Sequence, residues 1–205
     1  MKPGVADRVL IDGPAGRLEA TVARPSQPLR GLAVIAHPHP LFGGTMDNKV
    51  VQTLARAFLA LDHVVWRVNF RGVGASDGAY DEGRGEIDDF IALIEHARAE
   101  TPALPVAIAG FSFGGYVAAQ CAAALQPQRL VLVAPAVGRF AVPAVPAHTL
   151  VVHGEDDDVV PLREVLDWAR PAKLPIVVIP GAGHFFHGDL MLLQQLVLNA
   201  RVARE

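Results

Sequence analysis

The chain has 205 residues, of which 51% are hydrophobic, and a formal net charge of −3; this length fits one compact domain spanning residues 1–205. Lys and Arg are outnumbered by Asp and Glu and form no basic run, which argues against nucleic acid as a partner. No apolar run approaches the roughly 20 residues that span a bilayer, and residues 1–8 lack the apolar stretch of a secretory signal, so we expect a cytoplasmic protein without a membrane partner.

The first predicted element is a hairpin within residues 5–25 that turns at residues 13–16, because this stretch alternates and has little helix propensity. Apolar runs suited to buried strands follow at 32–36, 64–68, 106–109, 130–134, 149–152 and 176–179. Segments with helical spacing lie at 48–61, 86–99, 114–125, 161–169 and 190–202. This alternation predicts an α/β fold with a mostly parallel, doubly wound sheet and helices on both faces. Ligands of such sheets bind outside the carboxyl ends of the strands, so the chemistry is expected where each apolar run ends.

The third of these apolar runs is followed by the pentapeptide GFSFG, residues 110–114, which leads into a helical segment. G-x-S-x-G between a strand and a helix is the nucleophile-elbow pattern, in which a strained turn exposes the serine hydroxyl and glycines avoid clashes. The helix that follows would place its N–H groups beneath the serine, where an oxyanion develops. The pattern predicts Ser112 as a nucleophile, although a glycine-rich turn with an incidental serine has the same form.

A serine hydroxyl needs a base, and the base needs an acid that orients it. The fifth apolar run is followed by four consecutive carboxylates, Glu155 to Asp158, and the sixth is followed by His184. Serine, then acid, then histidine is the chain order of the triad on this type of sheet. The order therefore predicts His184 as the base, and the glycines before it leave room for a mobile, exposed histidine loop. His187 is the alternative, but we expect it to open the last helix.

Four blocks of the sequence together resemble a small bacterial subfamily of lidless α/β hydrolases: HPHPLFGGTMDNKVV at 37–51, NFRGVGAS at 69–76, AGFSFG at 109–114 and HFFH at 184–187. The resemblance covers nearly the whole chain. It implies the α/β-hydrolase fold without a cap domain and ester hydrolysis by a serine, but no particular physiological substrate.

The resemblance also bears on the triad acid. In related hydrolases the pattern His-Gly-x-x-Asp-x-x-x-Pro supplies the acid, and here it falls on Asp157. Asp156 and Asp158 stay open as alternatives. The other carboxylates of the run are interpreted as a solvated loop whose charges favour the following helix.

Two backbone N–H groups are expected to bind the oxyanion. One belongs to Phe113, the residue after the nucleophile, and the other comes from the loop after the strand at 32–36. The prolines of that loop have no N–H to donate. Related hydrolases donate from the third residue of a His-Gly-x-Pro segment, which implies His39 here, with Leu41 and Phe42 as alternatives.

The remaining reactive side chains are interpreted as structural. His37 and His39 could share a face, but no carboxylate or cysteine stands beside them at ligand spacing, so neither a metal nor another cofactor is expected. Cys121 lies among alanines on the helix after the elbow and is interpreted as a small packed residue. Arg71 and Asp77 are expected to brace the loop after the strand before them.

These features predict a serine hydrolase that cleaves a small-molecule carboxylic ester through an acyl-enzyme. A thioesterase or small peptidase with the same triad, and a non-catalytic binding protein on this fold, are the alternatives. The connection at 135–148 is short and contains several prolines, so we expect no helical cap and an open cleft that prefers short acyl chains. The sequence leaves the oligomeric state open, with a homo-oligomer as one option.

Overall fold

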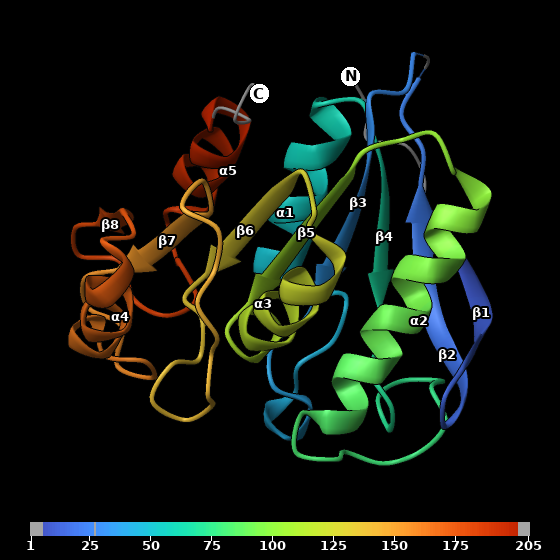
Figure 1. Ribbon diagram of the computed structural model, residues 1–205, viewed down its shortest axis with the longest axis horizontal. Helices are drawn as coiled ribbons and strands as arrows, with labels where there is room; N and C mark the ends of the chain where they lie inside the picture. The colour runs from blue at the N-terminus through green and yellow to red at the C-terminus, as the bar shows by residue number, and fades with distance from the viewer. Residues whose placement is uncertain (1–5, 27, 201–205) are drawn as a thin grey trace.

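The computed structural model describes residues 6–26 and 28–200, which form one eight-stranded sheet with helices on both faces (Figure 1). The strands are β1 (Asp7–Gly13), β2 (Gly16–Ala23), β3 (Gly31–Ala36), β4 (His63–Val68), β5 (Val106–Phe111), β6 (Arg129–Val133), β7 (Leu150–Gly154) and β8 (Ile176–Ile179). The helices are α1 (Lys49–Ala60), α2 (Arg84–Glu100), α3 (Phe113–Leu125), α4 (Leu162–Ala169) and α5 (Leu190–Asn199), with short 3-10 helices η1 (Pro40–Phe42) and η2 (Arg170–Ala172). None of the helices among these residues is both long and apolar enough to cross a membrane.

The sheet has the strand order β1-β2-β4-β3-β5-β6-β7-β8. The predicted hairpin is present: β1 and β2 pair antiparallel up to the turn that joins Gly13 and Gly16, and β2 pairs antiparallel with β4. All pairs from β4 to β8 are parallel. The predicted doubly wound, mostly parallel sheet is therefore confirmed. The carboxyl ends of its parallel strands lie toward the lower side of Figure 1.

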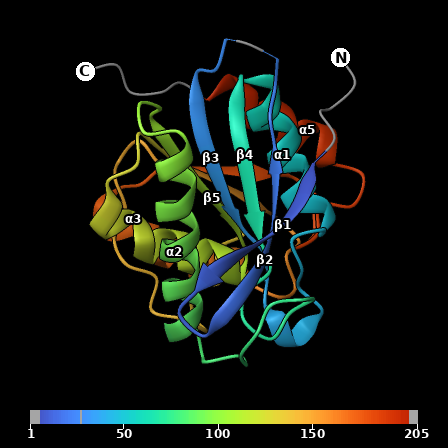
Figure 2. The ribbon, with the colours of Figure 1, turned by 90° about the vertical axis from the view of Figure 1, so that its right-hand side faces the viewer.

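Both faces of the sheet are buried, as β3 illustrates. Leu32 and Val34 pack into the cluster that includes residues of α2, α3 and α4, whereas Ala33 and Ile35 pack into the cluster of α1 and α5. Successive side chains of a strand point to opposite faces, so a strand covered on both sides is apolar throughout. Figure 2 shows α2 and α3 on one side of the sheet and α1 and α5 on the other.

The observed boundaries differ from the predicted ones by small shifts. The helix predicted from residue 86 begins at Arg84, where the Glu86 carboxylate accepts hydrogen bonds from two N–H groups of the preceding turn. Ala134, predicted as strand, has a φ of 43° and leaves the sheet. The predicted end of the last helix, residues 201–202, lies outside the described residues.

The connection between β6 and β7 contains no helix. Residues 135–148 form an irregular loop with one isolated bridge between Val137 and Phe140. Trp168 of α4 holds this loop by donating its indole N–H to the carbonyl of Val142 at 3.1 Å. As expected, this connection places no cap over the carboxyl ends of the strands.

Candidate active site

Ser112 lies in a sharp turn between β5 and α3, at the carboxyl end of the sheet. Its φ of 56° and ψ of −117° are angles that a residue with a Cβ rarely adopts. Gly110 and Gly114 allow the turn to close. A Cβ on Gly110 would collide with the carbonyl oxygen of Gly114, and a Cβ on Gly114 would collide with that of Ala36. Both glycines of the pentapeptide are therefore required by the close approach of backbone atoms.

Loops after β5, β7 and β8 bring Ser112, Asp157 and His184 together. His184 Nε2 lies 3.0 Å from Ser112 Oγ, and His184 Nδ1 lies 2.7 Å from Asp157 Oδ2. An ionised carboxylate only accepts hydrogen bonds, so the ring proton is assigned to Nδ1, and Nε2 can accept the serine O–H. All three side chains belong to buried residues. The predicted nucleophile, base and acid thus form one hydrogen-bonded row.

Asp157 is fixed through both of its carboxylate oxygens. While Oδ2 faces the histidine, Oδ1 accepts hydrogen bonds from the N–H groups of Val159 at 2.9 Å and Val160 at 2.8 Å. Burial by itself raises the pKa of this carboxyl, but the hydrogen bonds from His184 and Val160 outweigh burial, and the pKa of Asp157 is lowered. Asp157 is therefore an ionised group at neutral pH whose position leaves one oxygen for the imidazole.

The other carboxylates of the acidic run behave in two ways. Asp156 and Asp158 are exposed, as expected for a solvated loop. Glu155 differs from that expectation, because its Oε2 accepts the N–H of Gly181 at 3.0 Å. The Asp156 N–H also donates to the carbonyl of Ala182 at 3.0 Å. These two bonds tie the loop that carries the acid to the loop that carries the histidine.

The histidine loop is more closely packed than the sequence suggested. The glycines before His184 predict a mobile, exposed loop, but His184 is only 4% exposed. Its ring packs against Phe111 and Phe185, with ring centroids 5.0 Å and 5.1 Å away. The expectation that His187 opens the last helix is also wrong, since His187 is exposed in the preceding turn and α5 begins at Leu190.

Sequence reasoning missed a second buried histidine beside the acid. His153 Nε2 donates to the carbonyl of Val160 at 2.9 Å and lies 3.5 Å from Asp157 Oδ2. Burial lowers the pKa of His153, so its ring is neutral and does not neutralise the Asp157 charge. The available signal was the position of His153 at the start of the pattern that leads to Asp157.

The candidate oxyanion donors differ in whether their N–H groups are already bonded. Phe113 is the first residue of α3, so its N–H has no acceptor within the helix. The N–H groups of Leu41 and Phe42 are bonded to His39, the first to Nδ1 at 3.2 Å and the second to the carbonyl oxygen at 3.1 Å. The N–H of His39 has no such acceptor among the described residues. Of the donors expected from the sequence, Phe113 and His39 are the two left free.

The two histidines of the loop after β3 use their ring nitrogens within the protein. His37 is buried, its Nδ1 donates to the carbonyl of Pro38 at 2.6 Å, and its Nε2 accepts the N–H of Phe70 at 3.1 Å. Burial lowers the pKa of His37 to about 4, so this ring is neutral. His39 Nε2 lies 3.1 Å from the hydroxyl of Tyr80. In the part of the chain that the structure describes, no three His, Cys, Asp or Glu side chains gather as a metal site would require.

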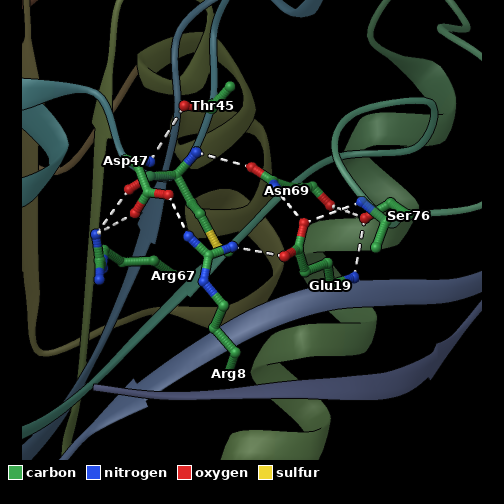
Figure 3. A network of polar contacts seen from close by, with 9 residues as sticks. Arg8, Glu19, Thr45, Asp47, Arg67, Asn69 and Ser76 are labelled. Atoms are coloured by element: carbon green, nitrogen blue, oxygen red, sulfur yellow. Dashed lines mark hydrogen bonds and ion pairs between the residues drawn. The ribbon is translucent and has the colours of Figure 1, made fainter. Parts of the chain in front are cut away.

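A polar network connects the loop before α1 to the edge of the sheet (Figure 3). Asn69 Oδ1 accepts the N–H of Met46 at 2.8 Å, and Asn69 Nδ2 donates to Glu19 at 2.7 Å. Glu19 also pairs with Arg8 at 2.6 Å, and Arg8 reaches Asp47 at 2.5 Å. The network therefore joins β1, β2, the loop after β4 and the loop that leads into α1.

The residues interpreted as structural have structural contacts. The Arg71 guanidinium forms hydrogen bonds of 2.7 and 3.0 Å with the buried carboxylate of Asp89 on α2. Asp77 accepts the N–H of Arg17 on β2 at 2.7 Å. Cys121 is buried, and burial raises the pKa of its thiol to about 12. The thiol is thus protonated and packed inside the protein.

A cavity of about 400 Å³ opens at Ser112 and His184. Its wall includes aromatic rings, an amide and one guanidinium, supplied by His39, Phe42, Asn48, Arg139, Phe140 and Phe185. The row of hydrogen-bonded groups thus faces a space in which a small substrate can reach the serine hydroxyl.

Comparison with known proteins adds a family to this geometry. Residues 28–143 match the family described as serine aminopeptidase, S33. An α/β serine hydrolase without lid from Xanthomonas campestris is 38% identical, with a TM-score of 0.89 over 98% of this chain and 95% of that one. An α/β serine hydrolase homologue from Coxiella burnetii is 40% identical, with a TM-score of 0.86 over 94% and 95%. An uncharacterized protein of Rickettsia prowazekii is 31% identical, in an alignment that covers 87% of this chain and 82% of that protein.

Proposed function

Because the chain belongs to the serine aminopeptidase S33 family of α/β hydrolases and is similar to lidless bacterial serine hydrolases, we propose that it cleaves short-chain carboxylic esters. The observation that carries this proposal is the row from Ser112 Oγ through His184 to Asp157, with distances of 3.0 and 2.7 Å, beside an open cavity. A nucleophile, a base and an orienting acid within hydrogen-bond reach are what covalent acyl transfer needs.

In the proposed reaction, Ser112 Oγ attacks the ester carbonyl carbon while His184 Nε2 takes the hydroxyl proton. Asp157 keeps the other ring proton on Nδ1 and stabilises the imidazolium. The N–H groups of Phe113 and His39 bind the oxyanion. When the tetrahedral intermediate collapses, His184 gives its proton to the leaving alcohol, and the acyl group stays on the serine. Water activated by His184 then attacks the acyl-enzyme and releases the carboxylic acid.

The shape of the cavity supports short acyl chains. Each additional CH₂ contributes about 0.8 kcal/mol only if protein covers it. The loop at 135–148 forms no cap, and a cavity of about 400 Å³ lies near the lower end of the range for ligand sites. We therefore expect the best substrates to have acyl chains of about C2 to C6, without activation at a lipid–water interface.

The family description raises aminopeptidase activity as an alternative. An aminopeptidase must hold the positively charged amino terminus of its substrate close to the scissile bond. The cavity is instead lined by Arg139, and no Asp or Glu lines it among residues 6–26 and 28–200. A guanidinium repels an ammonium group in the same cavity, so an ester is the better fit.

Labelling with a fluorophosphonate tests the nucleophile. The probe should modify the wild type at Ser112, as located by mass spectrometry. Ser112→Ala should lose the label and lower hydrolysis of p-nitrophenyl butyrate by roughly 10⁴-fold or more, with an unchanged circular dichroism spectrum. The matched control Ser26→Ala removes an exposed serine and should keep both the label and the hydrolysis of p-nitrophenyl butyrate.

A substrate panel tests the bond type. It compares p-nitrophenyl esters from acetate to laurate, an acyl thioester of matched length and leucine p-nitroanilide. We expect the short esters to have the highest kcat/KM. Equal labelling of Ser112→Ala, or faster cleavage of the anilide than of the butyrate ester, would contradict the proposed function.

A further inference from the structure

The cavity beside Ser112 contains an unexplained charge. Arg139 is the only permanently charged side chain among the described residues that line it. It lies in the loop after β6, next to Phe140, whose ring is also part of the wall. The Glu164 carboxylate lies against the neighbouring Gly138, yet no ion pair between Glu164 and Arg139 is formed. Nothing in the triad chemistry uses this guanidinium.

Other groups near the cavity add to the positive charge of Arg139. Asn48 lines it and caps the N-terminus of α1, and α3 begins at Phe113, so two helices direct their partly positive ends toward this region. Lys49 Nζ lies 5.9 Å from the ring centroid of Phe185, which lines the cavity. Walls with charges of one sign raise the local concentration of a ligand with the opposite charge.

The charge of Arg139 extends to the place where the carbonyl oxygen is expected to bind. The pKa of His39 is lowered, first by burial and second by the positive charge of Arg139. His39 is also the proposed second oxyanion donor. A substrate bound through its carbonyl oxygen would therefore lie within the field of this guanidinium.

We propose that the substrate is an ester that carries a carboxylate in addition to its scissile bond, and that Arg139 pairs with this carboxylate. This inference rests on the proposed function and names its substrate class. The planar guanidinium can hold a carboxylate through two parallel hydrogen bonds. Hydrolysis consumes one water and gives either a dicarboxylate and an alcohol, or a simple acid and a hydroxy acid, depending on which side of the ester bears the charge.

Two matched pairs of esters test the proposal. In the first pair the charge is on the acyl side, with monoethyl adipate against ethyl hexanoate. In the second pair it is on the alcohol side, with 4-acetoxybutanoate against butyl acetate. Each charged ester differs from its control by a carboxylate in place of a methyl group. Acid release is followed by titration at constant pH, and the readout is the ratio of kcat/KM for the charged ester to that for the neutral one.

Arg139→Gln should lower this ratio by about two- to fivefold in at least one pair, which is the effect of losing an exposed ion pair. Arg139→Lys should retain part of the preference, and about 0.5 M NaCl should weaken it in the wild type. The matched control is Arg30→Gln, because Arg30 is an exposed arginine just before β3, at the other end of the strand. A ratio that is the same in the wild type and Arg139→Gln for both pairs would overturn the proposal.

Binding of amide analogues separates this proposal from the proposed function. N-ethyladipamic acid and its neutral counterpart N-ethylhexanamide are titrated into the wild type and Arg139→Gln and followed by NMR. Weaker binding of the acid alone to Arg139→Gln supports carboxylate recognition even if no ester is cleaved. The opposite outcome is ester hydrolysis with equal binding of the acid to both proteins and with unchanged kcat/KM ratios. It would support the proposed esterase function but reject the role of Arg139 in carboxylate binding.

Discussion

The wall of the cavity formed by residues 38–48 is held by charged and amide groups, whereas the wall formed by residues 136–140 is held mainly by aromatic packing. In the first, which we call the braced wall, Met46 is bonded on both sides, its N–H to Asn69 and its carbonyl to Arg67 at 2.8 Å each. In the second, the aromatic wall, the Phe140 ring stacks on Tyr116 with centroids 4.8 Å apart. Hydrogen bonds fix direction as well as distance, and apolar contacts do not.

This difference matches the role that we propose for each wall. The braced wall carries His39, whose N–H is the proposed donor to an oxygen whose charge develops only in the transition state. The aromatic wall carries Arg139, which would contact a part of the substrate that does not react. We therefore expect changes in the braced wall to alter kcat, and changes in the aromatic wall to alter KM and substrate preference.

The largest effect is expected between the two walls, at the triad acid. Asp157→Asn should lower kcat by about 10⁴-fold, because the amide favours the wrong imidazole tautomer, as the equivalent change does in a serine protease. Asp156→Asn is the matched control and should cost far less, since Asp156 is exposed. Steady-state kinetics with a short-chain ester checks both. A larger loss of kcat for Asp156→Asn than for Asp157→Asn would identify Asp156 as the acid instead.

The next effect concerns the histidine at the base of the braced wall. His37 has a pKa of about 4 in the folded protein against an ordinary value of 6.5, so the unfolded chain binds this proton more tightly. Stability from this group is present above pH 6.5 and is lost as the pH falls toward 4, by about 3 kcal/mol in total. Urea unfolding from pH 7 to pH 4 measures the loss. His37→Asn should show a smaller loss over that range, and an equal slope for both proteins would contradict the assignment.

A smaller effect is expected from the amide that holds the braced wall. Asn69→Leu keeps the size of the side chain but leaves the Met46 N–H without its acceptor and removes one of the hydrogen bonds that Glu19 accepts. The expected loss of stability is about 2 kcal/mol, with a lower kcat at nearly unchanged KM. Urea unfolding and steady-state kinetics on the same samples test this. A change in KM with an unchanged kcat would contradict the proposed difference between the two walls.

The smallest effect is expected in the segment that directly follows the aromatic wall in the chain. Trp168→Phe removes the indole N–H that bonds Val142 at 3.1 Å while keeping an aromatic ring in the same place. Stability should fall by about 1 kcal/mol, and substrate preference should change more than kcat. Comparing kcat/KM for a short and a longer acyl ester detects the change. A kcat loss as large as that of Asn69→Leu would show that both walls position the reacting groups equally.

Local patterns predicted most of the fold and of the site. The buried strands are continuous apolar runs, and the elbow is a local motif, although one of its glycines, Gly114, is required by the carbonyl oxygen of Ala36 on β3. The hydrogen-bonded row of Ser112, His184 and Asp157 could be anticipated because its members follow strand ends in a fixed order. The acid was narrowed to Asp157 only by the resemblance, and the structure distinguishes it from its neighbours by burial.

What the sequence could not predict depends on contacts between distant segments. The Glu19–Asn69 bond joins residues 50 positions apart, and neither side chain belongs to a periodic pattern. The burial of His184 depends on Phe111, which lies on another strand. Flanking glycines report the freedom of the local backbone, but not the rings that pack over it, so the exposed histidine was the wrong expectation.

The position of His184 in the loop after β8 has a consequence for how the protein loses activity on heating. Ser112 follows β5 in the interior of the sheet, but β8 is an edge strand, and most of its residues are only partly buried. Sheet edges with few buried contacts open at a lower free energy than the molecule as a whole. A molecule frayed at this edge keeps its core and its serine but has no base. On heating, ester hydrolysis should therefore be lost at a lower temperature than the circular dichroism signal. The activity would then follow the opening of the β8 edge, and the circular dichroism signal would follow the unfolding of the sheet centre.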